Sequence, residues 1–126
     1  MLKTIPTIEG VQPGHETYSQ VVEAGGLVFV AGQVGSAPGY PGAVPGGVGA
    51  EMRAAFIHVS RLLEAVGLGL EDVVRCVVYL TDMGNFAAMD QVFRGLFPTD
   101  PPVRAAVGVS GLARDFCVEV EVTAAR

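Results

Sequence analysis

The sequence contains a single lysine, Lys3, and this scarcity excludes several kinds of site. No glycine is followed by Lys-Ser or Lys-Thr, so a phosphate-binding loop of that type is absent. The same scarcity argues against a Schiff-base mechanism, which needs a lysine in the site. Acidic residues number 13 against 8 basic ones, giving a net charge of -5. A nucleic-acid or anionic-membrane surface needs a cationic patch, so we expect neither partner.

Cysteine and long apolar runs are also scarce. Cys76 and Cys117 each lie among valines, at a spacing that fits neither a metal site nor a redox pair. We expect both thiols to be buried, reduced and structural. No run approaches the roughly 20 apolar residues that cross a membrane, and the first residues lack the apolar region of a secretion signal. We therefore expect a cytoplasmic protein.

The composition predicts one globular domain over residues 1–126, because half of the residues are hydrophobic and only 17% are charged. Hydrophobic periodicity and turn residues then predict the order β-β-α-β-α-β-β. Gly25 and Gly26 form the turn of the first hairpin, and residues 35–49 form a long loop rich in glycine and proline. The predicted elements are a hairpin at 18–33, helices at 50–66 and 86–97, and strands at 73–80, 103–110 and 116–124.

This order predicts an α+β fold in which both helices cover one face of a sheet. The strand at 73–80 nevertheless carries apolar residues on both faces, which is typical of burial on both sides. The face without helices therefore needs a partner. Self-association is the simplest way to cover such a surface.

Arg104 is a lone permanent charge in an apolar, strand-like segment. Alternation places it on the same face as Ala106 and Gly108, whose small side chains leave space in front of the guanidinium. Such a planar donor fork suits a carboxylate ligand. An ion pair at a strand end or an oligomer interface would explain Arg104 equally well, and the residues alone leave both readings open.

Glu119 and Glu121 alternate with valines in the last strand, which we expect to pair with the strand of Arg104 as a hairpin. One register places both acids on the face of Arg104 and the other register places them opposite. The connection has no diagnostic turn, so the register stays open. A solvated edge face is the alternative reading of the two acids.

The remaining polar candidates are weaker. Tyr18 suits either a ligand contact or a place at the rim of the core. His58 lies off the apolar stripe of its helix, and His15 has no neighbouring metal-binding residue type. The sequence contains no metal-binding or nucleophile motif, so it gives no support to a metal or a covalent mechanism.

Several short segments, in order and correctly spaced over roughly residues 18–125, resemble the RidA/YjgF family of reactive-intermediate deaminases. The segments are Tyr-Ser-Gln at 18–20, Leu-Val-Phe-Val-Ala-Gly-Gln at 27–33, Leu-Glu-Ala-Val-Gly at 63–67, Val-Tyr-Leu-Thr-Asp-Met at 78–83, Phe-Ala at 86–87, Pro-Pro-Val-Arg at 101–104 and Val-Glu-Val-Glu-Val at 118–122. Each segment alone is modest, and together they are specific.

The resemblance implies a chorismate-mutase-like fold and a homotrimer with a central barrel and ligand clefts between subunits. The implied activity is hydrolysis of imines and enamines such as 2-aminoacrylate to 2-oxo acids and ammonia, without a cofactor. By position, Arg104 would hold the substrate carboxylate and Glu119 would position the attacking water. Tyr18 would line the cleft, and its floor would be the backbone at Ala31, Gly32 and Gln33.

The chain also departs from the family pattern. Ala31 and Ala105 stand where many members carry a hydroxyl residue, and His15 belongs to an unusual approach to the first strand. The missing hydroxyls leave open a second function, a regulatory module that binds carboxylates with little or no catalysis. A third, a ribonuclease or translation inhibitor, is a label this family has also carried, and the acidic composition argues against it.

Overall fold

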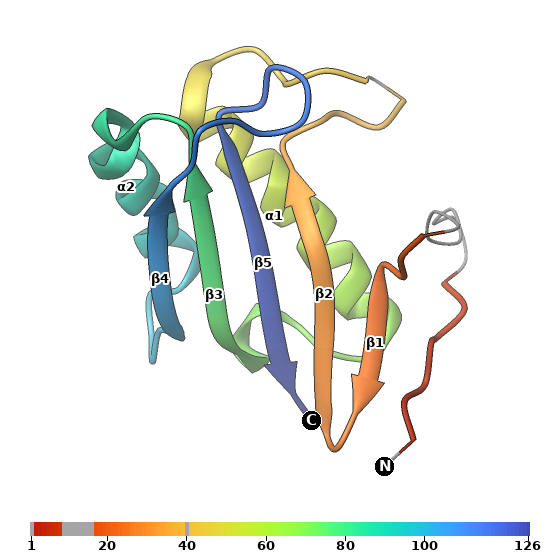
Figure 1. Ribbon diagram of the computed structural model, residues 1–126. Coiled ribbons are helices and arrows are strands. Elements are labelled where there is room, and N and C mark those ends of the chain that lie inside the picture. Colours follow the sequence, from red (N-terminus) through yellow and green to blue (C-terminus); the bar gives the residue numbers. More distant parts are fainter. Residues whose placement is uncertain (1, 9–16, 40) are drawn as a thin grey trace.

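The computed structural model describes residues 2–8, 17–39 and 41–126, and it confirms the predicted order of strands and helices (Figure 1). His15 and Tyr40 lie outside the described residues. The elements are β1 Val21–Ala24, β2 Leu27–Val34, α1 Gly47–Ala65, β3 Val73–Leu80, α2 Phe86–Leu96, β4 Val103–Gly108 and β5 Val118–Ala125, with short 3₁₀ helices at Leu70–Asp72 and Met83–Asn85.

Glycines with positive φ mark two of the element boundaries. Gly25 and Gly26 have φ of 60° and 79°, as a two-residue hairpin turn between β1 and β2 requires. Gly46 and Gly47, at 114° and 81°, lead into α1, so this helix begins three residues before the predicted position 50. The spacing of apolar residues did not predict this first turn, because glycine has no apolar side chain.

The five strands have the order β1-β2-β5-β3-β4, so β5 lies at the centre of the sheet and β4 at an edge (Figure 1). The predicted hairpin of the last two strands is therefore wrong. After β3 the chain crosses over through α2 and returns as β4, parallel to β3. β4 therefore occupies one side of β3. The antiparallel partner on the other side of β3 is β5.

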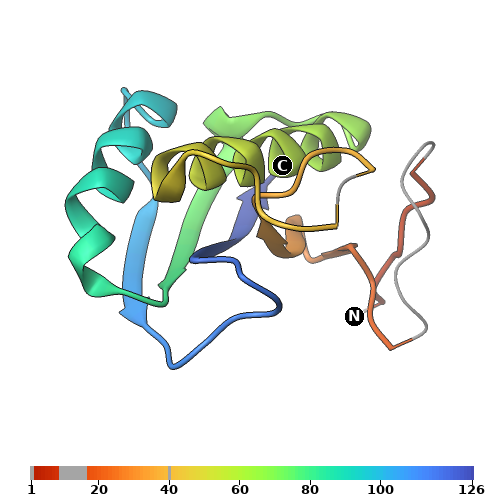
Figure 2. The same cartoon turned by 90° about the horizontal axis from the view of Figure 1, so that it is seen from above.

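Both helices pack against the same face of the sheet, which leaves the opposite face without helical cover (Figure 2). The core between helices and sheet is built from the alternate strand residues that point toward the helices and from the apolar stripes of α1 and α2. Its fully buried larger members include Phe56, Met52, Leu63, Leu80, Met89, Val28, Val59, Val78, Val118 and Val120. The predicted α+β arrangement is confirmed.

The face without helices is called the open face below. Val77 is only 6% exposed there. Phe29, Val103 and Val107 are 42%, 68% and 40% exposed, and the strand pairing places them on this face as well. The open face therefore carries apolar side chains from β2, β3 and β4. No helix within the described residues is long and apolar enough to span a membrane.

Candidate active site

Arg104 points toward α2, not into open space. It pairs in the parallel register with Cys76, whose side chain is fully buried beneath the helices. Its Nη1 donates to Asp90 Oδ1 at 2.7 Å, and its guanidinium carbon lies 4.7 Å from the ring centroid of Phe93. The expectation of empty space on this face is wrong, because α2 fills the room that Ala106 leaves.

Asp90 is a residue that the sequence analysis missed. Its Oδ2 accepts a second hydrogen bond at 3.0 Å from Nε of Arg94, one helical turn further along α2. The hydrogen bond from Arg104 is the main cause of a lowered pKa for the Asp90 carboxyl. Asp90 is therefore ionised at neutral pH, and a carboxylate already occupies one corner of the Arg104 guanidinium.

Glu119 and Glu121 lie on the open face, because the valines that alternate with them in β5 are buried beneath the helices. Glu119 pairs with Tyr79 of β3. The Tyr79 hydroxyl donates a hydrogen bond to Glu121. Arg104 and Glu119 of one chain therefore lie on opposite faces of the sheet, and β3 decides this because β4 and β5 do not pair with each other.

Burial is the main reason why the pKa of Glu119 is raised, and the neighbouring charge of Glu121 adds to it. The hydrogen bond to Glu121 raises the pKa of Tyr79 to about 12. Tyr79 therefore stays protonated and remains a donor at neutral pH. A carboxyl with a raised pKa beside a second acid is the kind of group that performs proton transfer. Tyr79 escaped the sequence analysis because it reads as one more apolar residue of β3.

A bulge in β2 brings Gly32 against the carboxyl group of Glu119. Ala31 and Gly32 together lie opposite the single residue Glu121, between the paired positions Val30 and Gln33. A Cβ at Gly32 would come within 2.7 Å of Glu119 Oε2. Only glycine leaves room for the carboxylate in this position, so the structure brings Gly32 and Glu119 together.

The Gln33 side chain lies on the other side of β2, because the bulge pairs Gln33 with the buried Val120. Its Nε2 donates to Gln20 Oε1 and to the Ala31 carbonyl, both at 3.0 Å. It lines a polar cavity of about 320 Å³ that also includes His58. Tyr18 precedes β1 and is 49% exposed.

The two cysteines differ in environment. Cys76 is fully buried, as predicted. Cys117 lies in a bend before β5 and is only partly buried, so the prediction of a buried thiol is wrong for this residue. Its Sγ donates to Glu51 Oε2 at 2.9 Å and its backbone N–H to Glu51 Oε1 at 3.0 Å. Glu51 of α1 is 5% exposed and was also missed.

The side chain of His58, the histidine that the structure describes, contacts the backbone of the loop before α1. Its ring atom, His58 Nε2, lies 2.6 Å from the carbonyl oxygen of Ser36 in the loop before α1. The described residues contain no cluster of three or more His, Cys, Asp or Glu side chains able to hold a metal ion.

Comparison with known proteins shows the family of the chain. The model of the family described as Endoribonuclease L-PSP matches residues 11–126. The chain belongs to the RidA/YjgF family.

Three relatives illustrate the similarity. A RutC family protein of Pyrococcus horikoshii is 38% identical over 107 residues, which cover 85% of both chains. The 2-iminobutanoate/2-iminopropanoate deaminase of Mus musculus is 36% identical over 107 residues, covering 85% of this chain and 79% of the mouse protein. The crystal structure of E. coli TdcF with bound serine has a TM-score of 0.84 at 29% identity, covering 96% and 98% of the two chains.

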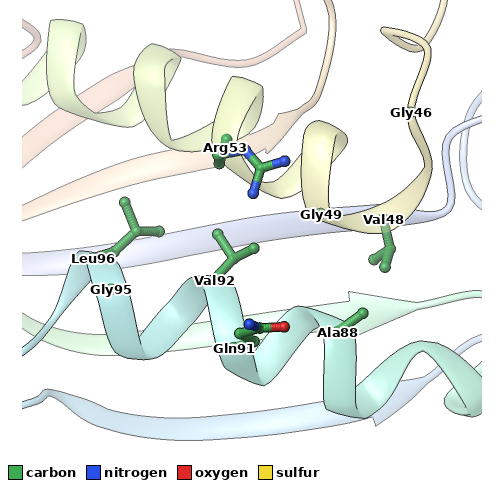
Figure 3. Close-up of a pocket in the computed structure, with 9 residues that line it drawn as sticks. All are labelled: Gly46, Val48, Gly49, Arg53, Ala88, Gln91, Val92, Gly95 and Leu96. Carbon is green, nitrogen blue, oxygen red and sulfur yellow. The ribbon is translucent and has the colours of Figure 1, made fainter.

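This member of the RidA/YjgF family also has a groove between its helices (Figure 3). Val92 and Leu96 rise from α2 toward α1, while Gly49 and Gly95 contribute no side chain, which leaves a cavity of about 680 Å³. Arg53 lies at its margin. The groove contains none of the site residues predicted from the sequence.

Proposed function

We propose that this chain hydrolyses small 2-imino acids, and enamines such as 2-aminoacrylate, to 2-oxo acids and ammonia. Relatives that are 36% and 35% identical bear the name of an imine deaminase. The observation that carries the proposal is the carboxyl group of Glu119. It has a raised pKa, lies against Gly32 and neighbours Tyr79, as a group that handles a water proton requires.

The proposed site forms between two copies of the chain in a homotrimer. Arg104 and Glu119 face opposite sides of one sheet, so a small substrate meets both only if Arg104 of one copy approaches Glu119 of another. Two features support this assembly. No strand of the described residues pairs with the outer side of β4, which carries Arg104, and the open face carries the exposed side chains of Phe29 and Val107.

In the proposed site Arg104 binds the substrate carboxylate through the donors that Asp90 leaves available. The backbone at Ala31, Gly32 and Gln33 forms the floor, and Tyr18 lines the wall. This arrangement orients the imine carbon toward a water molecule held by Glu119. An imine is already electrophilic, so orientation and one proton-transfer group suffice without a cofactor.

The proposed reaction is a simple hydrolysis. Glu119 accepts a proton as water oxygen bonds to C2 of the protonated imine, and a carbinolamine forms. The same carboxyl returns its proton to the amino group. The C–N bond then breaks, ammonia leaves with the electron pair of that bond, and loss of the hydroxyl proton gives the 2-oxo acid.

A second candidate is a carboxylate-binding regulatory module with little catalysis. Two observations favour it: Arg104 is already paired with Asp90, and the hydroxyl groups common in the family are absent at Ala31 and Ala105.

A coupled assay tests the proposal. An amino-acid dehydratase generates the imine in the reaction vessel, and the formation of 2-oxo acid is followed with and without this protein. We expect wild-type protein to accelerate the formation of the oxo acid. Arg104→Ala and Glu119→Gln should each remove the acceleration while the oligomer, measured by light scattering, stays intact.

Other outcomes are equally informative. Carboxylate binding without acceleration for any small imine would favour the regulatory module. Full activity of Arg104→Ala would contradict the proposed role of Arg104 in binding the substrate carboxylate. Cleavage of RNA by wild type that Arg104→Ala loses would point to the ribonuclease function.

A further inference from the structure

We propose that Asp90 offsets the positive charge of Arg104 and thereby restricts the proposed site to ligands that carry a single carboxylate. The inference rests on the proposed function, because it takes Arg104 to be the group that binds the substrate carboxylate. The observation behind it is the contact between Arg104 Nη1 and Asp90 Oδ1 at 2.7 Å.

Asp90 and two phenylalanine rings hold the Arg104 guanidinium in place. A guanidinium has five N–H donors on three nitrogens, and Asp90 contacts only Nη1. The rings of Phe93 and Phe86 lie 4.7 and 5.4 Å from the guanidinium carbon, so they fix its plane. Asp90 therefore orients the guanidinium and leaves its other donors for a ligand. By this reasoning Asp90 is a positioning residue.

Asp90 also offsets the charge of Arg104. The side chains of Arg104 and Asp90 are 22% and 20% exposed, and their charges cancel each other locally. Arg94, the other partner of Asp90, is 80% exposed, so water screens most of its charge. A ligand with one carboxylate adds one negative charge to this nearly neutral pair. A ligand with two carboxylates brings a second negative charge, and the only other cation that contacts this pair among the described residues is the screened Arg94.

The test compares two ligands of nearly the same shape and different charge. Succinamate carries one carboxylate, and succinate carries two. Binding of each is measured by calorimetry for wild type, Asp90→Asn and Asp90→Glu. We expect wild type to prefer succinamate. In Asp90→Asn, which keeps the shape and removes the charge, we expect this preference to fall by about tenfold.

Asp90→Glu keeps the negative charge that Asp90→Asn lacks, so it should keep the preference for succinamate. A merely structural role of Asp90 would not produce this difference between the two variants. Glu64→Gln is the matched control, because it removes one negative charge from an exposed position of α1. It should leave the ratio of the two affinities unchanged. Arg104→Ala should weaken the binding of both ligands.

The outcomes separate this inference from the proposed function. Equal binding of succinate and succinamate by wild type would overturn the role of Asp90, and this result needs no variant. The ratio of the two affinities could be unchanged in Asp90→Asn while wild type turns over imines and Arg104→Ala does not. This result would overturn the role of Asp90 and leave the proposed deaminase intact. If Arg104→Ala binds both ligands as tightly as wild type, Arg104 does not bind the carboxylate, and both proposals are contradicted.

Discussion

Arg104 and Glu119 lie on opposite faces of one sheet, two strands apart. Arg104 is held against α2 by Asp90, whereas Glu119 lies on the open face over Gly32. No small molecule bound to a single chain can contact both side chains. If the two groups serve one reaction, the oligomer is the catalytic unit, and a monomer has two separate half-sites.

The contact between Gly32 and Glu119 predicts a selective loss of activity in Gly32→Ala. The new methyl group would lie 2.7 Å from Glu119 Oε2, so the carboxyl group must move. A displacement of about 1 Å near the reacting atoms costs roughly a hundredfold in rate. The melting temperature should change little, because the displaced atoms belong to a side-chain end. Unchanged turnover in this variant would remove Glu119 from the reaction.

Gly95→Ala is a matched substitution with the opposite expectation. Gly95 lies in the last turn of α2, and an added Cβ has no atom within 4 Å. Alanine restricts the unfolded chain and favours the helix, so stability should rise by about 0.5 kcal/mol. Urea denaturation measures the change, and imine turnover should equal that of wild type. Lower stability would show that the helix groove is filled in solution.

Tyr79 should titrate late. The hydrogen bond to Glu121 raises its pKa to about 12, and the difference between the absorbance titrations of wild type and Tyr79→Phe isolates its phenol. In Glu121→Gln the midpoint should move toward the usual value of about 10.

The same bond gives a pH dependence of stability with a defined sign. The folded state favours the neutral phenol, so this contribution is fully present below about pH 10, the pKa of an unfolded tyrosine. It is lost as the pH rises through about 12. Tyr79→Phe should therefore show a smaller loss of stability across this window than wild type. Parallel curves for the two proteins would contradict the hydrogen bond.

Both thiols should be inert in the folded protein. Burial raises the pKa of Cys76 and of Cys117 to about 12, and for Cys117 the bond to Glu51 adds to the effect. At pH 8 a disulfide reagent should react slowly with native protein and rapidly with both cysteines after denaturation. Rapid reaction of native Cys117 would show a thiolate that this geometry does not provide.

Glu51→Ala tests the same pair through stability. It removes the acceptor of the Cys117 backbone N–H and leaves that partly buried donor without its partner. Such a loss costs about 1–3 kcal/mol. Glu51→Gln keeps one acceptor oxygen and should cost less. Chemical denaturation of both variants checks the order, and an equal loss in the two would assign the effect to the missing carboxylate charge instead of the hydrogen bond to the Cys117 backbone.

Periodicity predicted the elements well, because each helix and strand buries a face that its own sequence displays. The stripe of Met52, Phe56 and Val59 and the Gly25-Gly26 turn are local patterns, and local patterns appear in the structure as expected. The start of α1 was missed because Gly46 and Gly47 contribute no apolar side chain.

The site could be predicted only in part, since it depends on contacts between distant segments. Arg104 and Glu119 attract attention as charges in apolar strands, but which face each occupies is decided by β3, which lies between their strands. The bulge at Gly32 exists only as a mismatch between two strands. Asp90 appears as an ordinary polar residue of a helix until the parallel crossover brings Arg104 beside it.

The central position of β5 has a consequence for how the chain folds during synthesis. The ribosome completes β5 after the other four strands, yet β2 and β3 both pair with it and not with each other. Until β5 is in place, the sheet lacks its central strand, and nothing joins the β1-β2 hairpin to the β3-α2-β4 unit. Such intermediates expose apolar surface and strand edges, which makes them prone to misassociation. We therefore expect closure of the sheet to be a late event in folding, because it requires the last strand of the chain.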